Sequence, residues 1–172
     1  EVGWNKHFKK PFRWAVYGPP AGAAGRHGEL KEKFPEFLAE SEKSVFNILD
    51  IVEGSNVAIV SSGMGTSYVN DALTTLGKKG TCSTLEIGFV YPPPEEKMKA
   101  ILAAADKILV VEEGNPMLEN KLKELASDAG LSKNIIGRGS KAVMRTFDEL
   151  NPDIVLSAVS GLLGVTLPSI DV

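Results

Sequence analysis

The feature that most constrains the fold is a regular alternation of short apolar runs and amphipathic segments, which begins near residue 56. Such short runs are typical of strands buried on both faces. The segments between them repeat apolar residues at intervals of three and four, as helices do. The predicted strands are 57–60, 82–88, 108–111 and 135–137. This alternation predicts an α/β fold with three α/β/α layers, in which helices cover both faces of a mostly parallel sheet.

Glycine, proline and asparagine mark the expected helix boundaries. Gly77 and Gly130 follow amphipathic stretches and are expected to end two helices. Asn115 and Asn151 each precede a proline, so both are expected to cap a helix that opens on that proline. Pro94, followed by two acidic residues, suits the first turn of another helix.

The N-terminal part lacks this regularity. Residues 1–28 hold both tryptophans and a stretch rich in glycine, proline and alanine, which predicts an irregular arm. Residues 29–50 show helical spacing with an interruption at Pro35. We therefore expect a linker arm and helical lead-in over 1–50, the α/β domain over 51–166 and the start of another linker over 167–172.

Composition narrows the classes of partner. The net charge is −3, with basic and acidic residues interspersed, so nucleic acid is not an expected partner. No apolar run approaches the roughly 20 residues that span a bilayer, so no membrane partner is expected. The first residues lack the features of a signal peptide, and a start without methionine suggests that both ends are cuts within a longer chain.

The single cysteine, Cys82, cannot form an internal disulfide, an iron–sulfur cluster or a cysteine-rich zinc site. We expect it to be a small buried residue. A reducing, cytoplasmic location is expected.

Ligands of open parallel sheets bind beyond the carboxyl ends of the strands. Three segments fall there: 61–66, 88–94 and 112–116. They are expected to form ligand or interface loops, and no catalytic residue or metal ligand is predicted. The candidate residues are Ser62, Gly63, Gly65, Thr66, Tyr91, Glu112, Glu113 and Asn115.

The first segment contains half of a dinucleotide fingerprint. Gly63 and Gly65 follow a strand and open a helix, but Tyr68 replaces the third glycine. Glu86 lies at a suitable distance for a ribose-binding acid. An alternative function is therefore a stand-alone flavodoxin-like or Rossmann-like protein that binds a nucleotide or a flavin. The glycines are also explained by a tight turn, or by amide groups that hold an anion or a carboxylate of a partner.

The other two segments are less specific. The prolines after Tyr91 stiffen a loop that is suited to a ligand wall, an interface contact or a simple connection. Glu112 and Glu113 are adjacent on a strand and point to opposite faces, which disfavours a shared role as acid and base. We expect one of them to be exposed and the other to be held by helix-end amides or by a basic residue.

Two further patterns were weighed. The stretch 137–141, Gly-Arg-Gly-Ser-Lys, has the composition of a phosphate-binding loop, but a flexible surface loop is favoured. A receiver-like signalling module would place acids at the end of the first strand, where Ser61 and Ser62 stand instead.

Taken in order, several stretches resemble the alpha subunit of the 2-oxoacid:ferredoxin oxidoreductases, of the indolepyruvate type. The resemblance covers roughly residues 10 to 165, and Arg138 stands where the family tends to have lysine. The matching stretches are 26–30, 59–69, 91–95, 109–119 and 136–139.

The resemblance implies a domain similar to the C-terminal domain of transketolase, within an enzyme that oxidatively decarboxylates aryl 2-oxoacids such as indolepyruvate to acyl-CoA and reduces ferredoxin. Thiamine diphosphate, magnesium and iron–sulfur clusters belong to the full enzyme, but the thiamine signature and the cysteine runs are missing from this chain. The expected role is structural, without a cofactor or activity of its own. The expected contacts are other domains of the subunit, a second (beta) subunit and, for the whole enzyme, ferredoxin.

Overall fold

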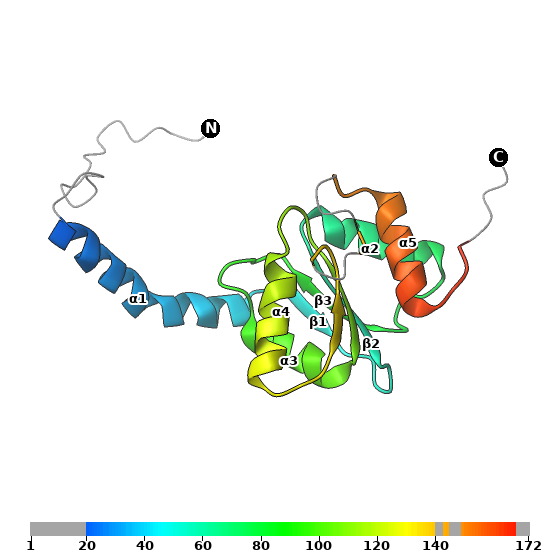
Figure 1. The fold of residues 1–172 in the computed structure, drawn as a ribbon, viewed down its shortest axis with the longest axis horizontal. Helices are drawn as coiled ribbons and strands as arrows, with labels where there is room; N and C mark the ends of the chain where they lie inside the picture. Colours follow the sequence, from blue (N-terminus) through cyan, green and yellow to red (C-terminus); the bar gives the residue numbers. More distant parts are fainter. Residues whose placement is uncertain (1–19, 140–142, 145–148, 168–172) are drawn as a thin grey trace. The chain divides into compact units, whose positions relative to one another are not determined.

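The computed structural model describes residues 20–139, 143–144 and 149–167 (Figure 1). The predictions made for the arm before residue 20, for Ser140 and Lys141, and for the tail after residue 167 lie outside the described residues. The chain divides into two compact units, 1–37 and 38–172. The sheet and every candidate residue belong to the second unit.

The sheet has five strands in the order β1-β3-β2-β4-β5. Strands β2, β3, β4 and β5 run parallel to one another, and β1 is antiparallel to β3. The prediction of a mostly parallel sheet is confirmed. The strands are β1 (Asn47–Asp50), β2 (Val57–Ser62), β3 (Ser83–Ile87), β4 (Lys107–Val111) and β5 (Asn134–Ile136).

Helices cover both faces of this sheet, which confirms the three layers (Figure 1). On one face lie α3 (Glu95–Ala104) and α4 (Met117–Asp128), and on the other α2 (Met64–Thr75) and α5 (Pro152–Leu163). Successive strand residues alternate between two buried cores: Ala58 and Val60 face α3 and α4, while Ile59 faces α2 and α5. The short apolar runs of the sequence are therefore strands buried on both sides.

The prediction of an irregular arm is wrong for residues 20–28, whereas the helix predicted from residue 29 is confirmed as far as Lys43. Helix α1 (Pro20–Lys43) begins inside the expected irregular arm and continues through Pro35. Pro20 suits a first helical turn, where a missing N–H costs no hydrogen bond, and the alanines that follow it favour a helix. Pro35 removes one backbone donor without ending the helix.

Residues 47–50 were expected to be helical, and this prediction is also wrong. The helix ends at Lys43, where the Ser44 Oγ accepts a hydrogen bond from the Phe46 N–H at 3.2 Å. The Asn47 side chain donates to the Ser41 carbonyl at 2.8 Å and accepts from the Phe89 N–H at 2.9 Å. These contacts place β1 beside β3, and a four-residue strand carries too short a pattern to reveal this in the sequence.

Most predicted helix boundaries are confirmed. Gly77 and Gly130 have φ of 63° and 65° just after α2 and α4. The Asn151 side chain accepts from the Ile154 N–H at 3.0 Å and caps α5. The prediction for Asn115 is wrong, because α4 starts after Pro116 and no local side chain caps it.

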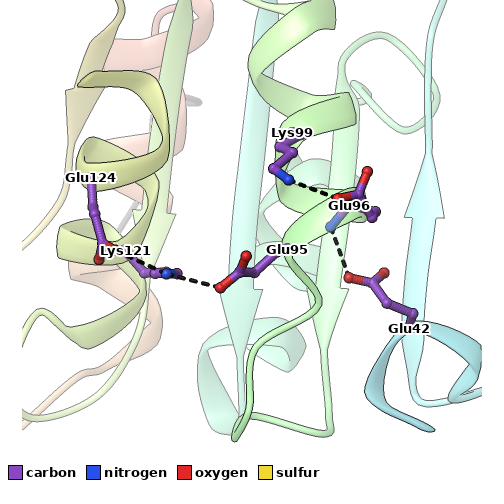
Figure 2. A network of polar contacts seen from close by, with 6 residues as sticks. All are labelled: Glu42, Glu95, Glu96, Lys99, Lys121 and Glu124. Carbon is purple, nitrogen blue, oxygen red and sulfur yellow. Dashed lines mark hydrogen bonds and ion pairs between the residues drawn. The ribbon is translucent and has the colours of Figure 1, made fainter. Parts of the chain in front are cut away.

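Helix α3 likewise starts without a local cap, after Pro94. A carboxylate from the end of α1 takes that role: the Glu42 Oε1 accepts from the Glu96 N–H at 2.7 Å (Figure 2). One ion pair of the same network, between Lys121 and Glu95 at 2.9 Å, ties α4 to α3 (Figure 2). Two further pairs lie within single helices: Lys121–Glu124 at 3.1 Å in α4 and Lys99–Glu96 at 2.7 Å in α3.

We expect Glu42→Ala to lower the free energy of unfolding by about 1 kcal/mol, the usual effect of removing a helix cap. Glu40→Ala is the matched control, since Glu40 lies exposed on the same helix. Urea unfolding of both variants measures the difference. Equal stability of the two would contradict the capping role of Glu42.

Candidate functional site at the strand ends

The carboxyl ends of β2 and β4 adjoin at the centre of the sheet, where Ser61 lies opposite Val111. From β2 the chain passes to β3 on one side, and from β3 it returns to β4 on the other. Ligands of open α/β sheets bind in the crevice at such a point. The structure places the candidate residues at 62–66 on one side of the point between β2 and β4 and those at 112–113 on the other. Tyr91 lies beyond the end of β3.

The first turn of α2 packs closely against the end of β4 at this point. A Cβ at Gly65 would lie 2.7 Å from the Val111 carbonyl oxygen, so only glycine allows the helix to approach β4 this closely. Gly63 has φ 55° and ψ −134°, a conformation that other residues rarely adopt. The Thr66 and Ser61 hydroxyl groups are hydrogen-bonded at 3.0 Å, and Ser62 is half-buried. The glycine pair therefore serves the turn and the packing.

The other residues of the dinucleotide hypothesis also have structural partners. Glu86, considered for a ribose, accepts a hydrogen bond from the Asn70 side chain at 3.1 Å. Tyr68, in place of the third glycine, packs against the core beneath α2 and α5. These contacts favour a packing role for the partial fingerprint.

Glu112 and Glu113 lie just beyond the end of β4, one buried and one exposed, as expected. Glu112 is 4% exposed and accepts from the N–H groups of Leu118 at 2.8 Å and Glu119 at 3.0 Å. Glu113 and Asn115 are exposed. Glu112, rather than Asn115, therefore caps α4. Burial raises the pKa of the Glu112 carboxyl above its ordinary value, and the helix N–H groups partly oppose that shift.

We expect Glu112→Ala to lower the free energy of unfolding by about 1–3 kcal/mol, because it leaves buried N–H groups without an acceptor. Urea unfolding measures the loss.

A second variant, Glu112→Gln, keeps a hydrogen-bond acceptor at this position but cannot carry a negative charge. A raised folded-state pKa gives wild type a stability contribution that is fully present below the ordinary pKa and lost as the pH rises through the folded-state pKa. Wild type should thus lose stability relative to Glu112→Gln as the pH rises from about 4 to 7. Urea unfolding across that range measures the difference, and a gain by wild type would contradict the assignment.

The Gly-Arg-Gly turn after β5 is not a surface loop, so that interpretation is wrong for residues 137–139. Gly137 and Arg138 are buried. The Gly139 N–H donates to the Glu119 Oε2 at 2.7 Å, and Lys123 forms an ion pair with the same carboxylate. A Cβ at Gly137 or Gly139 would lie 2.6 Å from a Glu119 oxygen. The turn is closed around a carboxylate of its own chain.

Glu119 was missed in the sequence. Its side chain is completely buried. It shares a helix face with Leu122 and Ala126, three and seven residues on, so an acid in an apolar stripe was the available signal.

The tyrosine–proline loop presents its tyrosine outward. Pro92 and Pro94 are buried, whereas Tyr91 exposes 70% of its surface. This arrangement favours an interface contact.

Among residues 20–139, 143–144 and 149–167, no group of three or more His, Cys, Asp or Glu side chains could hold a metal ion. Cys82 is 2% exposed, and burial raises the pKa of its thiol, so the prediction of a small buried residue is confirmed. Within the same ranges, no helix has the length and apolar character to cross a membrane.

A groove of about 490 Å³ lies away from the strand ends. It runs between α5 and the starts of β4 and β5, and none of the candidate residues lines it. Its lining residues include Lys107, Asn134, Ile136 and Gly161.

Comparison with known proteins gives a consistent match. No family model matches the chain. It is 32% identical over 153 residues to indolepyruvate oxidoreductase subunit IorA of Methanothermobacter thermautotrophicus, covering 88% of this chain and 24% of that protein. It is 29% identical over 149 residues to the IorA subunit of Pyrococcus abyssi, covering 87% and 22%. The chain thus spans about a quarter of the length of these relatives, and the family resemblance is confirmed.

A solved structure shows the same fold. The 2-oxoglutarate:ferredoxin oxidoreductase of Magnetococcus marinus superposes with a TM-score of 0.53 and 17% identity, over 86% of this chain and 24% of that chain. This match supports the α/β fold.

Proposed function

We propose that this chain, which is related in sequence to about a quarter of the IorA subunit of indolepyruvate oxidoreductase, is a scaffold domain of an enzyme of that kind. The enzyme would oxidatively decarboxylate aryl 2-oxoacids such as indolepyruvate to acyl-CoA and reduce ferredoxin. The observation that carries the proposal is the sequence match over 88% of the chain.

The role within the enzyme is proposed from the strand ends. Gly65 packs against Val111, Glu112 caps α4, and Glu119 holds the turn after β5. Gly65, Glu112 and Glu119 thereby have packing or capping roles. In this proposal thiamine diphosphate, magnesium and iron–sulfur clusters are held elsewhere in the enzyme.

The proposed partners are other domains of the same subunit, a second (beta) subunit and ferredoxin, in the cytoplasm. The exposed side chains of Tyr91, of Ile48 in β1 and of Phe46 just before it support contacts with other parts of the assembly.

The test is affinity purification of the tagged chain, as its gene encodes it, from its own cells. The purified complex is assayed for reduction of a viologen dye that depends on indolepyruvate and coenzyme A. We expect activity in that complex and none for the 172-residue chain made alone in another host. A complex without activity on any 2-oxoacid, or a chain active by itself, would overturn the proposal.

A further inference from the structure

On one side of the sheet, the described helices cover the β1 edge only in part. The core beneath α2 and α5 takes Ile59 from β2 and Leu109 and Val111 from β4. Among the described residues, no apolar side chain of β1 or β3 belongs to that core. Helix α2 reaches β3 through the Asn70–Glu86 hydrogen bond, whereas Ile48 and Asp50 of β1 are exposed.

The strand register defines which side chains share this face. Leu49 of β1 packs on the opposite face, against the core beneath α3 and α4. Because side chains alternate along a strand, its neighbours in β1 point the other way, together with their partners in β3. We call this set the β1–β3 patch: Phe46, Ile48, Asp50, Thr84 and Glu86.

The patch is apolar at its centre and acidic around it. Phe46 exposes 70% and Ile48 53% of their surfaces. Asp50 is exposed and has no ion pair within the described part of the chain, and Glu86 accepts its one hydrogen bond from the neutral Asn70 amide. The patch itself contains no basic residue. Two carboxylates thus flank Ile48 without a compensating cation, which calls for a partner with basic groups.

The edge of β1 is less suited to a partner than the face. Lys97 donates to the Asn47 carbonyl at 2.5 Å, and this blocks an outward-facing backbone acceptor that an added strand would need. A second copy on the same face would bring like charges together, since a two-fold interface repeats the same surface.

A single helix fits the dimensions of the face. Two strands are about 10 Å wide, which matches the diameter of one helix. We propose that the β1–β3 patch docks one amphipathic helix from another domain or subunit. Its apolar stripe covers Phe46 and Ile48, and its Lys or Arg residues pair with Asp50 and Glu86. This inference rests on the scaffold role proposed above.

The test uses two synthetic helical peptides of about 14 residues, or roughly 20 Å. Both carry leucines on one face, and the flanking residues are lysines in one peptide and glutamates in the other. The isotope-labelled chain is titrated with each and followed by NMR. We expect the lysine peptide to shift the amide signals of residues 46–50 and 84–88 and to bind at least about tenfold more tightly than the glutamate peptide.

Charge-reversal variants provide the matched control. The double variant Asp50→Lys with Glu86→Lys should reverse the preference between the peptides, and an unchanged signal pattern elsewhere shows that it is folded. Equal binding of both peptides, shifts confined to other surfaces, or a concentration-dependent dimer of the chain through this face would overturn the inference. The titration reads binding and not catalysis, so its failure is distinguishable from failure of the proposed activity.

Discussion

Gly65→Ala is expected to lower the free energy of unfolding by about 3 kcal/mol, near the upper end of the usual cost of overpacking a core. The added methyl group would lie 2.7 Å from the Val111 carbonyl oxygen and 3.0 Å from its side chain. The carbonyl belongs to the interior strand β4 and cannot rotate away as a side chain would. The helix must therefore move off the sheet, which opens the core beneath α2.

Gly161→Ala is the matched control. Gly161 also lies inside a helix, α5, and a Cβ there would have no heavy atom within 4 Å. Alanine has the higher helix propensity, so this variant should gain about 0.5–1 kcal/mol. Urea unfolding of both variants separates the effects. If Gly65→Ala were also stabilising, the close approach of α2 to β4 would be refuted.

Glu119→Ala is expected to cost about 2–4 kcal/mol, because it removes a fully buried side chain and the hydrogen-bond acceptor that this side chain provides. The substitution leaves the Gly139 N–H without its carboxylate acceptor and Lys123 without its partner. It also empties the space against which Gly137 and Gly139 are packed. The turn after β5 should loosen, and hydrogen exchange at Gly139 should accelerate.

Glu124 offers the control on the same helix. Its side chain is 58% exposed and pairs with Lys121, and such surface pairs contribute about 0–1 kcal/mol. We therefore expect Glu124→Ala to unfold almost as wild type does in urea. Similar losses for both variants would show that the Glu119 carboxylate does not hold the turn.

The layered fold could be predicted because its strands are buried on both faces. Runs such as 57–60 and 108–111 appear as uninterrupted apolar stretches only in that setting. The ends of α2 and α4 could be predicted from Gly77 and Gly130, because the residue after a helix often needs a positive φ that glycine adopts easily.

Strand β1 and the caps of α3 and α4 could not be predicted, because they depend on tertiary contacts that the local sequence does not encode. Strand β1 forms because Asn47 bonds to Ser41 and Phe89, the latter 42 residues away. The caps of α3 and α4 come from Glu42 and Glu112 rather than from adjacent residues. Asn115 met the local rule for a cap but was displaced by a carboxylate already fixed at the end of β4.

The candidate residues lie at or beyond the strand ends, as the sequence predicts, and their role as a ligand or interface site stays a prediction. The expectation that one of Glu112 and Glu113 is held by helix-end amides and the other is exposed is confirmed, although both residues follow β4 rather than belong to it. The partner of Gly65, Val111, lies across the sheet and is visible only once the strands are paired.

The claim that the chain itself fills its strand ends is tested most directly by calorimetric titration with NAD, FMN and thiamine diphosphate. With α2 packed against Val111, we predict no binding to the chain alone tighter than about 1 mM, or roughly −4 kcal/mol. Micromolar binding of any of the three, with amide signals of residues 62–66 and 112–116 shifting on addition, would contradict it.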